Sequence, residues 1–265
     1  MDRLAILAGA GALPVQLAGA YPDAVQITFD GVAHDLGAGT HVHAFETLGA
    51  LFDDLRSHNV TKVVLAGSMS RPPLNPARFD SYMQSVAPRL LAAFQQGDDA
   101  LLSLVIALFE EQGFIVVGAH ELLPDLTFSP VHIGPDPSSQ DLDDATQAQD
   151  ILHALSPLDL GQSAVVAAGL CLGIETIQGT DALLRFTALT PPHLRRAKGV
   201  LVKMPKRGQD LRVDMPAIGP DTIRNAATAG LSGIIIAAHK TLILDQTATR
   251  HALTDTGLFL RAEAL

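Results

Sequence analysis

A run of ionic side chains in the second half of the chain is the stretch best suited to phosphate chemistry. It lies within KGVLVKMPKRGQDLRVDMPAIGP, residues 198–220, and comprises Lys203, Lys206, Arg207, Asp210, Arg212 and Asp214. The chain is only 17% charged, so this is a local concentration. Carboxylates bind a hard divalent cation, and lysine and arginine bind phosphate oxygens. The run therefore suits a phosphate ester with a metal ion, although a surface network of salt bridges is the alternative.

Apolar strands that end in polar turns must position these charges. Residues 200–202 are an apolar strand, and the prolines and glycine that follow favour a fixed loop over a helix. A second apolar strand, 170–177, carries Glu175, a carboxylate that is costly to bury unless it is paired or bound to metal. Thr180 and Asp181 follow this strand, and either would cap the next helix.

We expect the polar ends of these segments to meet at one edge of a sheet. That arrangement would bring carboxylates close to cations, namely Glu175, Asp181, Asp210 and Asp214 close to Lys203, Lys206 and Arg212. Several carboxylates beside a phosphate would repel it unless they were compensated, which favours a metal-dependent site.

The first half of the chain alternates predicted strands and helices. Strands are expected at 4–8, 25–29, 62–66 and 114–117, and helical periodicity covers 46–58 and 79–112. This order predicts βαβ units with a parallel sheet. The strand at 62–66 is followed by Gly67, Ser68 and Arg71, at the position where open α/β sheets bind ligands. A turn with a structural arginine is the alternative.

Two further features of the first half have simpler interpretations. The turn AGAGALP (8–14) resembles a dinucleotide-binding turn, but Pro14 stands where the third glycine belongs, so a tight strand-to-helix connection is favoured. His34, His41 and His43 lie close together, but no Cys or further His stands at a metal-binding spacing. We interpret these histidines as unrelated loop or strand residues.

Composition limits the classes of function. A formal net charge of −10 and a pI near 5.3 exclude binding of nucleic acid through its backbone, which needs a basic surface. A single cysteine, Cys171, fits a reducing compartment. No apolar run is long enough to span a membrane, and glycines and Pro14 break the N-terminal apolar segment, which favours a first strand over a signal peptide. We expect a cytoplasmic protein.

A change of composition marks the domain boundary. Residues 129–144 are rich in proline, serine and aspartate, as an exposed connection would be. We therefore expect an α/β protein of two domains. Residues 1–130 would form an N-terminal Rossmann-like domain with a parallel sheet, 131–144 a linker, and 145–265 a C-terminal catalytic domain of mixed α/β structure.

Seven motifs along nearly the whole chain resemble those of a known family. In order they are AGAGALP at 8–14, GSMSRP at 67–72, GDDALL at 97–102, GQSAVV at 161–166, ETIQGTD at 175–181, GVLVKMPK at 199–206 and QDLRVDMPAIGP at 209–220. Together they are similar to the LpxI-type UDP-2,3-diacylglucosamine pyrophosphatases of lipid A biosynthesis in Gram-negative bacteria. The chain departs from that pattern at Gln178, where a second Glu is expected, and at Arg207, where a proline is expected.

The resemblance implies a reaction, a cofactor and partners. It implies hydrolysis of the pyrophosphate of UDP-2,3-diacylglucosamine to UMP and lipid X (2,3-diacylglucosamine 1-phosphate) with Mg²⁺. It also implies two domains with the acylated sugar phosphate between them. A substrate that carries acyl chains suggests peripheral contact with the inner face of the inner membrane, although no basic amphipathic segment stands out. A homodimer is left open.

Hydrolysis of a phosphoric anhydride depends mainly on charge neutralisation and positioning, and this assigns roles to the residues. We expect Asp214 to be the most important Mg²⁺ ligand, with Asp210 and Asp181 next, and Glu175 to be a ligand or general base. The catalytic set is then Asp214, Asp210, Glu175 and Lys203. Substrate contacts are expected from Gly67, Ser68, Arg71, Thr180, Lys206, Gln209 and Arg212.

Two other classes of function compete with a hydrolase. The first half could be a sugar-nucleotide binding module in a non-catalytic carrier of a UDP-sugar or an acyl-sugar phosphate. The turn at 8–14 also suggests a nicotinamide-dependent oxidoreductase, but the incomplete glycine pattern argues against that class. A carrier has no need for several acidic residues around a diphosphate, so the acidic residues favour the metal-dependent enzyme.

Overall fold

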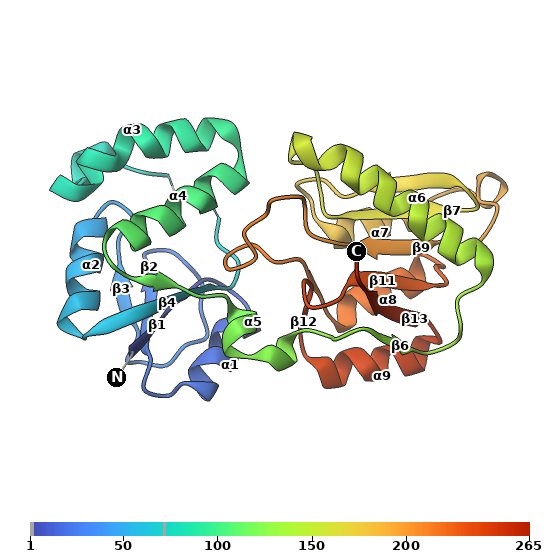
Figure 1. The fold of residues 1–265 in the computed structure, drawn as a ribbon, viewed down its shortest axis with the longest axis horizontal. Coiled ribbons are helices and arrows are strands. Elements are labelled where there is room, and N and C mark those ends of the chain that lie inside the picture. Colours follow the sequence, from blue (N-terminus) through green and yellow to red (C-terminus); the bar gives the residue numbers. More distant parts are fainter. Residues whose placement is uncertain (1–2, 71–72) are drawn as a thin grey trace. The chain divides into compact units, whose positions relative to one another are not determined.

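The computed structural model describes residues 3–70 and 73–265, which fall into two compact units (Figure 1). The N-terminal unit extends to Pro124 and also includes Arg212–Asp214. The C-terminal unit comprises Asp125–Leu211 and Met215–Leu265. The two units meet between Pro124 and Asp125, a few residues before the predicted boundary at residue 130. The predicted limits of the linker, 131–144, stay a prediction.

The N-terminal unit is built on a five-stranded parallel sheet with strand order β3-β2-β1-β4-β5. The strands are β1 Arg3–Ala8, β2 Val25–Phe29, β3 His41–His43, β4 Val60–Ala66 and β5 Ile115–Val116. The helices are α1 Ala12–Ala20, α2 Leu48–Ser57, α3 Ser81–Gln96, α4 Asp98–Glu111 and α5 Ala119–Leu122. This confirms the predicted Rossmann-like parallel sheet.

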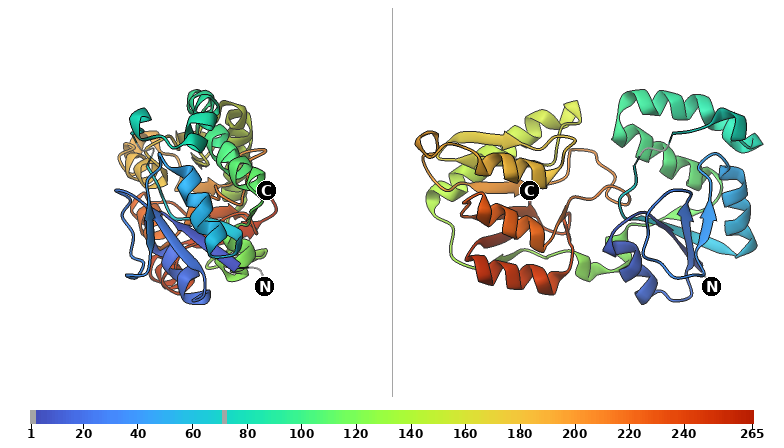
Figure 2. Two further views of the ribbon diagram at one scale, coloured as in Figure 1. Left: turned by 90° about the vertical axis from the view of Figure 1, so that its left-hand side faces the viewer. Right: turned by 180° about the vertical axis from the view of Figure 1, so that it is seen from behind.

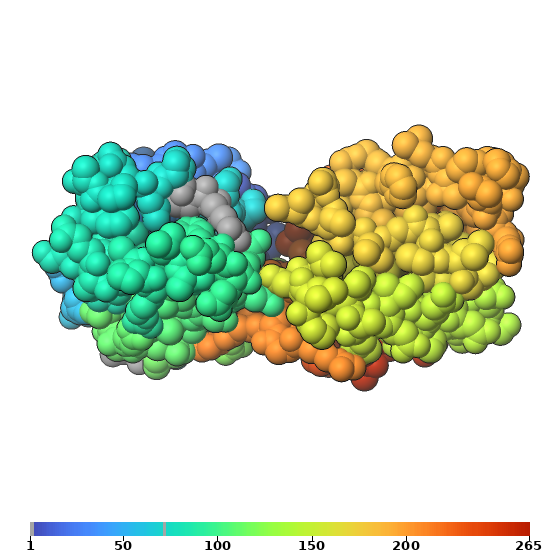
Figure 3. Space-filling view, turned by 90° about the horizontal axis from the view of Figure 1, so that it is seen from above, coloured from blue at the N-terminus to red at the C-terminus, as the bar shows by residue number. Residues whose placement is uncertain are grey.

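Apolar residues on one face of this sheet make the N-terminal core. Strand residues such as Ala5, Leu7 and Ile27 pack with buried side chains of α2, α3 and α4, among them Phe52 and Phe109. On the other face, α1 packs on β1 and α5 on β4. In the space-filling view, the teal to green residues of α3 and α4 cover much of the visible surface of this unit (Figure 3).

The C-terminal unit contains a mixed six-stranded sheet with order β6-β13-β11-β9-β7-β8. Its central strands β13, β11 and β9 are parallel, whereas β6, β7 and β8 run antiparallel to their neighbours. The strands are β6 Val131–Ile133, β7 Ser163–Ala167, β8 Leu170–Ile174, β9 Val200–Lys203, β11 Gly233–Ala237 and β13 Phe259–Glu263. A separate parallel pair joins β10 Ala217–Ile218 to β12 Leu242–Ile243.

Helices cover both faces of this sheet, giving three layers (Figure 2). Alternate strand residues point to opposite faces. Val200 and Val202 therefore pack towards α6 (Ser139–Leu155), whereas Leu201 packs towards α7, α8 and α9. These three helices span Thr180–Ala188, Pro220–Thr228 and Gln246–Thr256.

The segment expected to be a linker, 131–144, contributes regular structure to this unit. It contains β6 and the first turns of α6, which begins after the N-cap Ser138. Asp144 is buried, and its carboxylate accepts hydrogen bonds from the backbone N–H groups of Ala168 and Gly169, each at 2.8 Å. Both residues have positive φ, so Asp144 fixes the tight turn between β7 and β8.

Among the residues that the structure describes, no helix is both long and apolar enough to cross a lipid bilayer.

Candidate active site

Glu175, Thr180 and Lys203 form a hydrogen-bonded cluster in the C-terminal unit. Lys203 Nζ lies 3.2 Å from Glu175 Oε2 and also donates to Thr180 Oγ1. The Thr180 hydroxyl donates to the same carboxylate oxygen at 2.6 Å. The Lys203 and Glu175 side chains are only 6% and 12% exposed. The prediction that Glu175 and Lys203 lie close together is therefore confirmed.

The register of three neighbouring strands places this pair. Lys203 is the last residue of β9, and alternation along the strand directs its side chain to the face covered by α7. Its register partner on β7 is Ser163, whose carbonyl accepts the Glu175 N–H at 2.8 Å. Glu175 was expected inside the strand, but β8 ends at Ile174, so Glu175 is the first residue of the polar turn.

The start of α7 supplies the hydroxyl of the cluster. The helix begins at Thr180, and its N-cap is Gly179, with no side-chain capping bond. The expectation that Thr180 or Asp181 would be the cap was therefore wrong. Gly179 has φ +82°, which glycine adopts without strain. Thr180 is thus available to bond Glu175 and Lys203.

Burial and charge act on Glu175 in opposite directions. Burial raises the pKa of its carboxyl, but the charge of Lys203 and the hydrogen bonds from Thr180 and Lys203 outweigh burial and hold the pKa below its ordinary value. Glu175 is therefore ionised near neutral pH and is a weak proton acceptor. This favours a role in positioning Lys203 over the role of general base.

The loop after β9 holds two of the predicted substrate contacts. Lys206 forms an ion pair with Asp159, and its backbone N–H donates to Gln209 Oε1 at 2.8 Å. The next backbone N–H, of Arg207, donates to Ser156 Oγ at 2.7 Å. These bonds fix the loop between two segments of the C-terminal unit, as its prolines and glycine predicted. Asp210 follows in the same loop and is half-buried.

The short segment Arg212–Asp214 belongs to the N-terminal unit. Arg212 Nη1 donates to Glu110 Oε1 at 2.8 Å, and Val213 packs against the N-terminal core. Asp214 is half-buried in this segment. The predicted ligands therefore divide, with Asp214 in one unit and Asp210 in the other, and their joint role as a Mg²⁺ site stays a prediction.

Asp181, the third predicted ligand, lies in the first turn of α7. Its Oδ1 accepts a hydrogen bond from Asn225 Nδ2 of α8 at 3.0 Å, and its side chain is exposed. A carboxylate in the first turn interacts favourably with the helix dipole. Asp181 directly follows Thr180, the residue whose hydroxyl bonds both Glu175 and Lys203.

The N-terminal unit has its own candidate ligand edge where β1 and β4 end. The backbones of Ala10 and Ser68 exchange two hydrogen bonds, of 2.8 and 2.9 Å. A Cβ at Gly67 would lie 2.6 Å from the Ala10 carbonyl oxygen, so the close approach requires glycine. The strand order changes direction between β1 and β4, which is where open sheets bind ligands. Arg71 lies outside the described residues.

Sequence reasoning missed one polar cluster. His41 and His43 both contact the carboxylate of Asp54, with His58 on its other oxygen. The interpretation of His41 and His43 as unrelated residues was therefore wrong. Two spacings could have indicated the cluster: histidines at i and i+2 share one side of a strand, and Asp54 and His58 at i and i+4 share one face of a helix.

Fold and site together define the class of protein. A Rossmann-like unit precedes a mixed α/β unit that buries a lysine beside a carboxylate and a hydroxyl, an arrangement suited to an anionic ligand. Two family models cover the chain, the LpxI N-terminal domain over residues 3–126 and the LpxI C-terminal domain over residues 130–261. The chain therefore belongs to the LpxI family.

A curated relative supports this assignment over the full length. The chain is 39% identical over 272 aligned residues to UDP-2,3-diacylglucosamine pyrophosphatase LpxI of Caulobacter vibrioides. The alignment covers 98% of this chain and 97% of that protein. The resemblance stated from seven short motifs is thus confirmed.

Proposed function

We propose that this protein is a UDP-2,3-diacylglucosamine pyrophosphatase of lipid A biosynthesis. It would add water across the pyrophosphate bond and release UMP and 2,3-diacylglucosamine 1-phosphate. The observation that carries the proposal is the full-length similarity to the Caulobacter vibrioides enzyme, with both LpxI domains present. The buried Lys203 cluster supports it, because a diphosphate needs fixed positive charge.

The cluster of Lys203, Glu175 and Thr180 can supply part of the charge neutralisation that this reaction requires. An ammonium has three N–H donors. Among the described residues, Glu175 and Thr180 each accept a hydrogen bond from the Lys203 ammonium. The third N–H donor can then bind a phosphate oxygen. The ionised Glu175 holds the Lys203 side chain in position. The lysine is held before substrate arrives, so little reorganisation is needed in the transition state.

We propose that carboxylates among the remaining polar residues hold a divalent cation. Asp181, Asp210 and Asp214 offer only carboxylate oxygens, the ligand type that Mg²⁺ takes, and Mg²⁺ is commonly held by one or two carboxylates with substrate phosphates. When bound, the cation would neutralise diphosphate charge and activate water. We propose Asp214 as its most important ligand, with Asp210 and Asp181 next. Arg212, Lys206, Gln209, Gly67, Ser68 and Arg71 are proposed to contact substrate.

Substitution of Asp214 tests this assignment. UMP released from UDP-2,3-diacylglucosamine by the purified full-length chain would be measured by chromatography. Asp214→Ala is expected to abolish turnover with an unchanged circular dichroism spectrum. Asp221→Ala, which removes a carboxylate that is 81% exposed in α8, is the matched control and should retain full activity. Near wild-type turnover by Asp214→Ala would contradict the assignment.

The acyl chains of the proposed substrate suggest where the protein works. We propose a cytoplasmic enzyme that meets its substrate at the inner membrane surface. Large apolar side chains are exposed on and near α7, including Ile177, Phe186 and Leu189, and would suit such an encounter. Flotation of the purified protein with liposomes that contain the substrate tests this contact, and absence from the lipid fraction would contradict it.

A further inference from the structure

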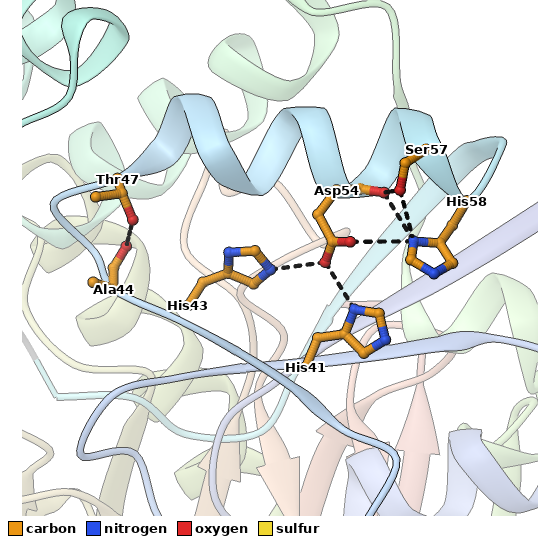
Figure 4. Close-up of polar contacts among 7 residues, drawn as sticks. All are labelled: His41, His43, Ala44, Thr47, Asp54, Ser57 and His58. Carbon is orange, nitrogen blue, oxygen red and sulfur yellow. Dashed lines mark hydrogen bonds and ion pairs between the residues drawn. The ribbon is translucent and has the colours of Figure 1, made fainter.

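Three imidazole rings surround one carboxylate in the N-terminal unit (Figure 4). Asp54 Oδ2 lies 2.8 Å from His41 Nδ1 and 2.9 Å from His43 Nε2, and Asp54 Oδ1 lies 3.2 Å from His58 Nδ1. His58 Nδ1 also lies 3.0 Å from the Asp54 carbonyl oxygen and 3.1 Å from Ser57 Oγ. A single carboxylate needs one cationic partner, so three histidines exceed the needs of a salt bridge.

Two secondary-structure elements bring these side chains together. His41 and His43 are the ends of β3, the edge strand of the parallel sheet, and their side chains point to the same side. Asp54 lies one turn before His58 at the end of α2. The edge strand is only three residues long, and two of its three side chains bond Asp54 of α2.

The distances suit coordination of a cation. His41, Asp54 and His58 each offer one ligand atom, and these three atoms lie within 4.8 Å of one another. In a tetrahedral zinc site with bonds of about 2.0–2.1 Å, neighbouring ligand atoms are about 3.3 Å apart. His41 Nδ1 lies 2.8 Å from Asp54 Oδ2 and His58 Nδ1 lies 3.2 Å from Asp54 Oδ1, so each histidine already has one carboxylate oxygen near that distance. A cation could therefore replace the bridging protons with small side-chain shifts.

The surroundings provide access and an outer shell. His41 and His58 line an open cleft of about 530 Å³ in the N-terminal unit, so an ion can enter and one coordination position can remain for water. His43 is more buried than His41 and His58, with 13% of its side chain exposed, and its bond to Asp54 would orient the ligating carboxylate. Arg3 also lines the cleft and donates to the His58 carbonyl, so one fixed positive charge opposes the ion.

We propose that His41, Asp54 and His58 form a binding site for a divalent transition-metal ion of the zinc class, with His43 as a positioning residue. Imidazole ligands favour zinc, nickel and copper over magnesium, so this site differs in chemistry from the carboxylate set proposed for Mg²⁺. The bound ion would join the edge strand β3 to α2 and stabilise the N-terminal unit. The proposal does not rest on the proposed function.

Zinc binding by the full-length chain tests the proposal. All variants would carry Cys171→Ser, because Cys171 is free and exposed and thiolates are zinc ligands. After removal of metal with EDTA, Zn²⁺ affinity would be measured by competition with a chromophoric chelator. One equivalent should bind, excess Mg²⁺ should not displace it, and Co²⁺ should give the visible absorption of a tetrahedral site.

Single substitutions separate ligation from a structural role. His41→Gln and His58→Gln should each weaken Zn²⁺ affinity at least 100-fold, and His43→Gln about ten-fold. His153→Gln, on α6 of the C-terminal unit, is the control and should leave the affinity unchanged. Zinc should raise the melting temperature of the parent chain and not that of His41→Gln. Absent binding, or equal affinity in the parent and the His41→Gln/His58→Gln double variant, would overturn the proposal.

Discussion

The buried pair of Lys203 and Glu175 makes a quantitative prediction about the stability of the C-terminal unit. Lys203→Met keeps the length of the side chain but removes the charge, which leaves the Glu175 carboxyl, only 12% exposed, without its cationic partner. Removing one partner of a buried ion pair typically costs about 3–5 kcal/mol. Because the Lys203 side chain is 6% exposed, solvent screening should reduce this little, and we expect a loss near 3 kcal/mol.

A second substitution shows whether the loss comes from the uncompensated charge. Glu175→Gln in the Lys203→Met background removes that charge, so the double variant should regain more than half of the lost free energy of unfolding. Lys198→Met makes the same change at an exposed position just before β9, and should alter stability by less than about 0.5 kcal/mol.

Native-state hydrogen exchange is the suitable assay, because a chain of two units need not unfold in one step. The free energy of opening would be measured for peptides that cover β7 and β9, in the full-length protein at pH 7. A loss below about 1 kcal/mol in Lys203→Met, or no recovery in the double variant, would refute the reasoning. Either result would mean that the pair is not energetically coupled.

Two further predictions concern a glycine and a carboxylate. Gly67 and Gly113 have almost equal φ values, +88° and +89°, but an added Cβ meets Ala10 O at 2.6 Å only at Gly67. Gly113→Ala should therefore cost only about 1 kcal/mol of backbone strain, and Gly67→Ala at least about 1 kcal/mol more, measured by thermal unfolding; equal losses would show that the β1 and β4 ends can separate freely. The lowered pKa of Glu175 means that its contribution is present above its ordinary pKa of 4.5 and is lost as pH falls through the folded-state value. The free energy of opening of the β9 amides, obtained from exchange rates corrected for the intrinsic rate at each pH, should therefore fall in acid in the wild type, and Glu175→Gln should remove that part of the pH dependence; an identical pH profile in both would contradict the assigned shift.

Much of the fold followed from local patterns. The apolar run before Lys203 and the apolar pair of segments that meets near Gly169 predicted β7, β8 and β9, because buried strands need continuous apolar sequence. The Glu175–Lys203 contact followed from the cost of burying a lone carboxylate inside apolar surroundings. These predictions rest on the free energy of burying each side chain, which depends on the chemistry of that residue.

Other features depend on tertiary contacts that no local pattern contains. Arg212 is separated from Glu110 by most of the C-terminal unit, so the return of this segment to the N-terminal unit has no signal in nearby residues. The cluster of His41 and Asp54 joins a strand to a helix that follows it, and requires the packing of α2 to be known. Gly179 caps α7 because its positive φ ends the preceding turn, whereas capping preferences alone pointed to Thr180.

The most direct test of the proposed function is release of UMP from UDP-2,3-diacylglucosamine by the purified wild-type chain, with Mg²⁺ and then with excess EDTA. We expect stoichiometric UMP and 2,3-diacylglucosamine 1-phosphate with Mg²⁺, and no release after EDTA. Release that survives EDTA would keep the reaction and remove the metal from the proposal. Tight binding of the substrate without release of UMP would contradict the account and identify the protein as a carrier.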